Sequence, residues 1–169
     1  KCLNEIVKHT ANVAIIIGFI DKNKSRKGKP IFNAAAFAYN KKILQISHKT
    51  LLPTYDVFDE DRYFERGTPA MPVKFLGKRI GISICEDIWN DPSLWKRNLY
   101  DKNPIEFQKK NGADILINIS ASPFWQGKKQ TREKLLANIA KKNNLPVIYA
   151  NQVGGNDELV FDGRSYAFN

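Results

Sequence analysis

Apolar and polar positions in the first half of the chain predict three strands. Residues 13–20 (VAIIIGFI) are a continuous apolar run, which is typical of a strand buried on both faces. Residues 32–39 and 42–48 are two further strand patterns, and they flank Asn40-Lys41, so they predict a β-hairpin. Residues 2–10 before these strands have the pattern of a helix end.

The second half alternates between strand and helix patterns. Strands are predicted at 115–119 and 147–150, a helix at 105–111 ending before Gly112, and an amphipathic helix at 128–142. Two hairpins are predicted, one from 73–76 and 79–84 through Gly77-Lys78, the other from 159–161 and 165–168 around Asp162-Gly163. This alternation indicates the α/β class. Residues 49–72 show no period, and so long a loop is typical of a functional segment.

The composition narrows the class of protein. With 169 residues, 43% of them hydrophobic, the chain can form one folded domain. No apolar run approaches the roughly 20 residues that span a bilayer, so no membrane partner is expected. The two cysteines, Cys2 and Cys85, form no Cys/His cluster, which argues against a disulfide scaffold and a structural metal site. A reducing, cytoplasmic location fits this pattern. Because the chain opens at Lys1 without an initiator Met or a signal peptide, we expect it to be a piece of a longer protein.

The net charge of +10 raises the alternative of a basic, non-catalytic domain that binds nucleic acid. The charge is unevenly distributed, because residues 50–95 and 146–169 are net acidic. The basic residues fall mostly in turn-like and helix-like segments, where solvated lysines are usual. No interleaving of aromatic residues with arginine indicates an RNA-binding surface. We therefore expect no nucleic-acid partner and keep this function as the less favoured alternative.

A candidate nucleophile lies in RIGISICEDIW, residues 79–89. Period-two alternation places the three isoleucines on one strand face and Gly81, Ser83 and Cys85 on a second, small and accessible face. Acidic residues follow the strand at once, as at a helix N-terminus, so Cys85 is expected on a tight strand-to-helix turn. Backbone N–H groups there can stabilise a thiolate or an oxyanion. A lone cysteine at a strand end can equally be an inert core residue.

A cation that could lower the pKa of this thiol follows the strand 42–48. If that strand runs beside the Cys85 strand, Lys49 emerges near the same edge and its ammonium can stabilise both a thiolate and an oxyanion. Taken alone, Lys49 can also be a surface cation. His48 lies on the opposite strand face, so both side chains cannot point at one thiol. We therefore interpret His48 as lying outside the site.

Several motifs occur together in one order between about residue 12 and residue 169: HKTLLPTY, FDEDRYFERG, GISICEDIW, NISASPF and YANQVGGNDELVFDGRS. In this order the chain resembles the carbon–nitrogen hydrolase (nitrilase-like) superfamily, and more narrowly the glutaminase domain of glutamine-dependent NAD synthetases. The resemblance implies an αββα sandwich, truncated at its N-terminus, that spans residues 1–169. It also implies hydrolysis of the glutamine side-chain amide through a cysteine thioester.

The resemblance also implies roles for individual residues. It places the nucleophile at Cys85, the family lysine at Lys49 and an accessory glutamate at Glu60. Substrate contacts fall on five further residues: Tyr55, Glu86, Trp89, Ser122 and Lys128. Each of these five has an ordinary alternative, since the aromatic residues can be packing residues, the serine a turn residue and the lysine a solvated cation.

The resemblance implies partners and one absence. Glutamine is the expected substrate, a synthetase domain in the same parent chain is the expected partner, and a symmetric homo-oligomer is expected. No cofactor is expected for this domain, because ATP and Mg²⁺ belong to the synthetase domain. In the family the general-base glutamate follows the first strand, upstream of every residue of this chain, and Glu5 lacks its sequence context. The first strand with this glutamate and the C-terminal synthetase domain are therefore expected to be absent from residues 1–169. The chain alone is therefore expected to have little activity. Another amidase or carbamoylase of the same superfamily is the alternative.

Overall fold

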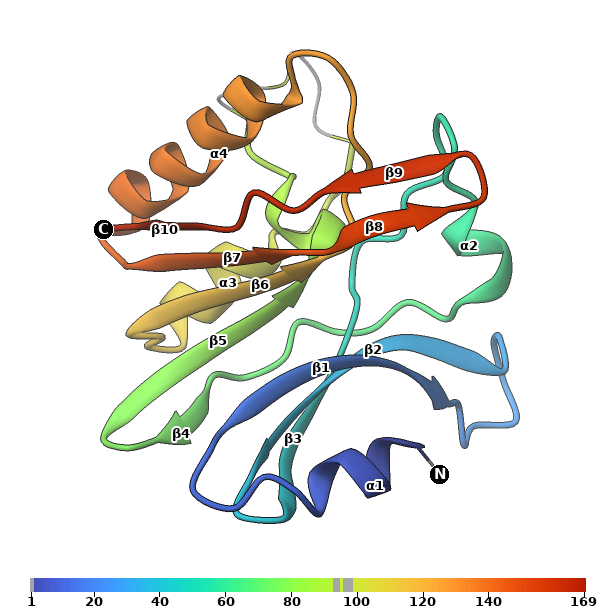
Figure 1. The fold of residues 1–169 in the computed structure, drawn as a ribbon, viewed down its shortest axis with the longest axis vertical. Helices are drawn as coiled ribbons and strands as arrows, with labels where there is room; N and C mark the ends of the chain where they lie inside the picture. The colour runs from blue at the N-terminus through green and yellow to red at the C-terminus, as the bar shows by residue number, and fades with distance from the viewer. Residues whose placement is uncertain (1, 93–94, 96–98) are drawn as a thin grey trace.

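The computed structural model describes residues 2–92, 95 and 99–169. Figure 1 shows four layers in the order helix, sheet, sheet, helix. The first sheet holds β1 (Ile15–Lys22), β2 (Ile31–Tyr39) and β3 (Lys42–His48), all antiparallel, with α1 (Cys2–Val7) beside it. Asn40 and Lys41 connect β2 to β3 with φ angles of 48° and 62°, as a tight hairpin turn requires. The predicted hairpin is confirmed.

The second sheet has the strand order β10-β7-β6-β5-β4. Its three central strands are β5 (Lys78–Ile84), β6 (Ile115–Ser120) and β7 (Val147–Asn151), which run parallel, while β4 (Val73–Phe75) and β10 (Tyr166–Phe168) are antiparallel edges. The helices α3 (Pro104–Lys110) and α4 (Lys128–Asn143) cover its outer face (Figure 1). The carboxyl ends of β5, β6 and β7 therefore meet at one edge of this sheet.

Two apolar cores hold the layers together. The core between the helices and the second sheet includes Leu135, Leu136, Ile139 and Ala140, which confirms the predicted buried face of α4. The core between the sheets contains the three isoleucines of β5 together with Ala35 and Phe37 of β2. Residues 34–38 of β2 are fully or almost fully buried, so this central strand is covered on both of its faces.

Two local predictions need correction. β1 is not buried on both faces, because its burial alternates and Ile20 is 66% exposed. Among the described residues β1 pairs only with β2 and is an edge strand, so an apolar run alone did not reveal which layers cover it. The β4–β5 turn is made by Leu76 and Gly77, with φ angles of 47° and 75°, one residue earlier than predicted.

The predicted closing hairpin around Asp162-Gly163 is wrong. β9 (Leu159–Asp162) pairs instead with β8 (Val153–Asn156) in a separate two-stranded ribbon, and β10 pairs with β7. The reason is a long-range contact, because the buried Arg132 of α4 binds Asp162 Oδ1 at 3.2 Å and the Gly163 carbonyl at 3.4 Å. These bonds hold the chain between β9 and β10 against α4. Within the described ranges, no helix is long and apolar enough to cross a membrane.

Replacing Asp162 by asparagine is expected to lower the free energy of unfolding by about 3–5 kcal/mol, because it leaves a buried guanidinium without its carboxylate. Arg132 is fully buried in this ion pair. The matched control is Asp61→Asn, which removes a carboxylate that binds Lys29 and Arg66 at the surface. That control is expected to cost about 0–1 kcal/mol. Urea unfolding of both variants measures the difference, and equal losses would contradict the account.

Candidate active site

Cys85 occupies the sharp turn at which β5 ends and the 3₁₀ turn η1 (Cys85–Ile88) begins. Its φ angle is 44°, in the left-handed region that residues with a Cβ rarely adopt. Such strained backbone persists where the surrounding structure holds it, and it clusters at functional sites. The predicted strand-to-helix turn is confirmed.

The strand face that precedes Cys85 is not accessible, contrary to the prediction. Gly81 and Ser83 are buried beneath α3, where Gln108 Nε2 donates to the Ile82 carbonyl at 2.6 Å. A Cβ at position 81 would lie only 2.6 Å from Gln108 Oε1, so glycine is what lets the helix approach. Cys85, by contrast, is partly exposed and lines a cavity, because it lies beyond the end of the strand.

Lys49 follows β3 directly and is 1% exposed. β3 does not run beside β5 in one sheet, as the prediction assumed, but faces it across the sandwich. Burial lowers the pKa of Lys49, but Cys85 in its ionised form and the carboxylates of Glu60 and Asp87 outweigh burial, so the pKa is raised above its ordinary value. Lys49 therefore stays an ammonium group near the thiol at neutral pH.

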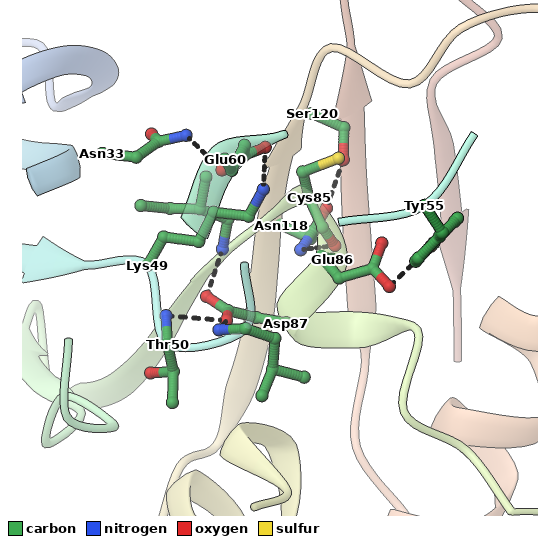
Figure 2. Close-up of polar contacts among 12 residues, drawn as sticks. Asn33, Lys49, Thr50, Tyr55, Glu60, Cys85, Glu86, Asp87, Asn118 and Ser120 are labelled. Carbon is green, nitrogen blue, oxygen red and sulfur yellow. Dashed lines mark hydrogen bonds and ion pairs between the residues drawn. The ribbon is translucent and has the colours of Figure 1, made fainter. Parts of the chain in front are cut away.

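Glu60 is the first residue of α2 (Glu60–Tyr63), a short helix inside the segment that showed no sequence period. Its Oε1 accepts a hydrogen bond from Lys49 Nζ at 2.5 Å, and its Oε2 accepts one from Asn33 Nδ2 at 3.3 Å (Figure 2). Both oxygens are thus engaged. The arrangement fixes the direction in which the ammonium of Lys49 points.

The thiol itself is neutral at rest. Burial raises the pKa of Cys85, and the charges of Glu86 and Glu60 add to this effect. Lys49 and a hydrogen bond with Ser120 lower the pKa but do not cancel the increase. A base must therefore remove the thiol proton before Cys85 can act as a nucleophile at neutral pH.

Cys85 forms part of the wall of two neighbouring cavities. The larger has a volume of about 470 Å³ and is lined by Lys49, Glu60 and Asn33, and by residues 16–18 of β1. The smaller has a volume of about 220 Å³, and it contains all five residues that the resemblance assigned to substrate binding: Tyr55, Glu86, Trp89, Ser122 and Lys128. The residues that sequence reasoning singled out thus lie around one sulfur atom.

The smaller cavity carries opposite charges on different walls. Glu86 is 5% exposed, and its Oε1 accepts hydrogen bonds from Tyr55 at 2.7 Å and from Tyr100 at 3.0 Å. The ammonium of Lys128 lies 5.5 Å from the centre of the Trp89 ring. Burial lowers the pKa of Lys128. A zwitterionic ligand with an ammonium and a carboxylate suits such a pair of walls.

Three residues near Cys85 escaped the sequence reasoning. Asn118 Nδ2 donates to the Cys85 carbonyl at 3.4 Å, and Ser120 Oγ donates to Asn118 Oδ1 at 2.7 Å (Figure 2). Tyr100 is the third, through its bond to Glu86. A usable signal existed for the first two, because NISAS lies at the carboxyl end of a strand predicted to neighbour the Cys85 strand.

Two further observations concern a second candidate base for the thiol, His48, and residues that could bind a metal ion. His48 binds Asp21 at 2.8 Å and stacks on Phe32, so its placement outside the site is confirmed. In the part of the chain that the structure describes, no group of three His, Cys, Asp or Glu residues could hold a metal ion.

Comparisons with known proteins show which family the chain matches. The family model "Carbon-nitrogen hydrolase" matches residues 6–169. The glutamine-dependent NAD(+) synthetase of Synechocystis is 43% identical over 165 residues, which cover 96% of this chain and 30% of that protein. The structure of glutamine-dependent NAD+ synthetase from Acinetobacter baumannii superposes with a TM-score of 0.84 at 32% identity, over 98% of this chain and 29% of that one.

The fold also extends to more distant proteins. A carbon-nitrogen hydrolase from Helicobacter pylori has a TM-score of 0.76 at 23% identity, over 98% of this chain and 57% of that one. The αββα sandwich expected from the sequence is therefore confirmed. The chain spans about 30% of the length of the Synechocystis relative. Because the family model matches nearly the whole chain, the chain belongs to the carbon–nitrogen hydrolase family.

Proposed function

We propose that this chain is the glutaminase part of a glutamine-dependent NAD synthetase. It hydrolyses the side-chain amide of glutamine and supplies ammonia for the amidation of deamido-NAD elsewhere in a longer protein. The observation that carries the proposal is the arrangement of Cys85, Lys49 and Glu60 around one cavity, with Lys49 held by Glu60 at 2.5 Å. Curated relatives that match nearly the whole chain bear this name, which supports the assignment.

The smaller cavity is the proposed binding site for the amino-acid end of glutamine. Glu86 binds the α-ammonium group, because its buried carboxylate is already oriented by two tyrosines. Lys128 and Ser122 bind the α-carboxylate, and Tyr55 and Trp89 enclose the aliphatic part. These contacts place the side-chain amide at Cys85, which the two cavities share. A volume of about 220 Å³ suits a ligand of this size.

The proposed reaction proceeds in two steps. A base takes the thiol proton, Sγ attacks the amide carbon, and the ammonium of Lys49 stabilises the negative charge that develops on the carbonyl oxygen. The C–N bond breaks and the departing nitrogen takes the proton, so ammonia leaves and a γ-glutamyl thioester remains. The same base then activates water, which attacks the thioester and releases glutamate, and the thiol regains a proton.

The base is proposed to come from another segment of the longer protein. Three carboxylates lie near Cys85 among the described residues, and each accepts hydrogen bonds: Glu60 from Lys49 and Asn33, Glu86 at its Oε1 from two tyrosines, and Asp87 from backbone N–H groups. The larger cavity extends from Cys85 to the edge strand β1. A segment paired with β1 can therefore bring a glutamate to the thiol.

The remaining parts of the proposal concern the whole protein. The synthetase part of the same parent chain binds ATP and Mg²⁺ and uses the ammonia. The parent protein is cytoplasmic and assembles as a symmetric homo-oligomer. The relatives' name and their greater length support the synthetase part. The location and the oligomer are proposed from the family resemblance alone.

An electrophilic glutamine analogue, such as a diazoketone, is expected to alkylate Cys85 selectively in this chain. In this alkylation the thiol proton passes to the diazo carbon, Sγ bonds to that carbon and N₂ leaves, so the step needs no separate base, and Lys49 still stabilises the thiolate. Peptide mapping by mass spectrometry measures the label on Cys85 and on the exposed Cys2, which is the internal control. Glutamine is expected to protect Cys85, whereas asparagine and N-carbamoyl amino acids are not.

Two results would count against the proposal. Labelling that is equal at Cys2 and Cys85 would indicate an unspecific thiol reaction. Protection by an N-carbamoyl amino acid in place of glutamine would assign the site to another amidase of the family. In the variant Cys85→Ala the label is expected to disappear.

A further inference from the structure

A buried carboxylate without an assigned role joins the segments that carry Lys49 and Cys85. Asp87 lies in η1 and is 3% exposed. Its Oδ1 accepts a hydrogen bond from the backbone N–H group of Thr50 at 2.9 Å (Figure 2). The same oxygen accepts one from the N–H group of Leu51 at 2.9 Å, and Oδ2 accepts one from the N–H group of Ile84 at 3.0 Å. One side chain thus contacts the residues directly after Lys49 and directly before Cys85.

These two segments share no strand ladder. Lys49 follows β3 in the first sheet, whereas Cys85 follows β5 in the second, and β3 and β5 face each other across the sandwich. Their relative position therefore depends on the core between the sheets and on contacts between the loops. We propose that Asp87 is a positioning residue, whose ionised carboxylate holds the loop bearing the Lys49 ammonium against the turn bearing the Cys85 thiol. This inference rests on the thiol chemistry proposed above.

The contacts of Asp87 call for a carboxylate. Its two oxygens receive three N–H donors, whereas an asparagine would offer one oxygen and turn its NH₂ group toward a donor. An asparagine therefore cannot serve both segments. The left-handed backbone of Cys85, with φ 44°, also needs neighbours that hold it, and the bond to Ile84 lies one residue before it. Asp87 is absent from the described residues that line the two cavities, so it acts through its neighbours and not on the substrate.

The charge state of Asp87 changes in an accessible pH range. Burial raises the pKa of Asp87 to about 6, against the effect of its three N–H donors and of Lys49. Lys49 faces it from the loop after β3, Cys85 and Glu86 share its turn, and Glu60 lies beyond Lys49. When Asp87 is protonated, its O–H points at N–H donors and one bond is lost.

The pKa of Asp87 determines how the free energy of unfolding changes with pH. The pKa of Asp87 in the folded chain lies above its ordinary value of 3.8, so the folded state binds the proton more tightly than the unfolded state. This contribution to the free energy of unfolding is fully present below the ordinary value and is lost as the pH rises through about 6. The positioning of Lys49 improves over the same range. Stability is therefore expected to fall while Cys85 reactivity rises. Because ionisation of the thiol alone also raises its reactivity with pH, the positioning role is tested by comparing the wild type with Asp87→Asn.

The test measures alkylation of Cys85 by iodoacetamide against pH in a Cys2→Ser background, with no glutamine present. In Asp87→Asn the apparent pKa of the thiol is expected to rise by about one unit, which means about tenfold less thiolate at a given pH below the pKa. The control Asp114→Asn removes a carboxylate that accepts a hydrogen bond from the backbone N–H group of Arg79 at 2.7 Å. Arg79 lies at the start of β5, and Cys85 follows its other end. That control is expected to leave the profile unchanged. Asp87→Glu, which keeps the charge, is expected to lie between Asp87→Asn and the wild type.

A second measurement needs no variant. In the wild type, the amide resonances of Thr50, Leu51 and Ile84 are expected to titrate with one common midpoint near pH 6, as the Asp87 pKa of about 6 requires. The inference is overturned if the two segments titrate with separate midpoints, or if Asp87→Asn folds and keeps the wild-type alkylation profile. Because iodoacetamide does not resemble glutamine, these outcomes are independent of whether glutamine is the substrate.

Discussion

The 169-residue chain alone is expected to release ammonia from glutamine about 100- to 10,000-fold more slowly than the longer protein that we propose contains it, which is the usual range of general acid–base assistance. The pKa of Cys85 is raised, so its thiol is neutral at rest. The carboxylates near it among the described residues are engaged by Lys49, by tyrosines or by backbone N–H groups. Without a base, both the attack on the amide and the hydrolysis of the thioester are slow. Ammonia release from glutamine, measured for both proteins at equal concentration, tests this.

The control for folding is the alkylation of Cys85 by the electrophilic glutamine analogue. We expect the chain alone to be labelled although it turns over little glutamine, because binding and the position of Lys49 are retained. Rapid ammonia release by the chain alone, lost in Cys85→Ala, would show that the described residues already contain the base.

Replacing Lys49 by methionine is expected to lower kcat of the longer protein by about 100- to 1000-fold, the effect of losing one oxyanion donor. The substitution also removes the cation that opposes the raised pKa of Cys85, so the thiolate forms at higher pH. Lys49→Arg is not a conservative rescue, because a planar guanidinium does not fit a position that is 1% exposed and held by Glu60. The measurements are kcat for glutamine and the pH profile of Cys85 alkylation.

The matched control is Lys29→Met, which removes another lysine from an ion pair with a carboxylate, Asp61 at 3.1 Å. This pair is partly exposed and lies outside both cavities as far as the described lining residues show. Unchanged kcat in Lys29→Met, with a large loss in Lys49→Met, is expected. Equal rates in the two variants would remove Lys49 from the mechanism.

Local signals were sufficient for much of the fold. The hairpin between β2 and β3 follows from Asn40-Lys41, whose backbone the turn requires, and α4 follows from its apolar face. The errors arose where distant residues decide. The burial of β1 depends on which layers lie beside it, and the end of the chain is set by the Arg132–Asp162 contact, 30 residues apart in sequence.

In the candidate site, too, some features follow from local sequence and others depend on residues far apart in the chain. Motif order singled out Cys85, Lys49 and Glu60, and the structure gathers them around one cavity. The role of Asp87 was not predictable, because its carboxylate contacts backbone groups of a segment 36 and 37 residues earlier. A backbone N–H group has no sequence signature. The register of β5 against β6, which aligns Ser83 with Asn118, likewise emerges only from the assembled sheet.

The most direct measurement traps the covalent intermediate. The longer protein is mixed with glutamine, quenched in acid within one turnover, digested and analysed by mass spectrometry. The account predicts a γ-glutamyl group on the peptide that contains Cys85, and neither this adduct nor ammonia release in Cys85→Ala. Full ammonia release by Cys85→Ala, or an adduct on a different residue, would contradict it.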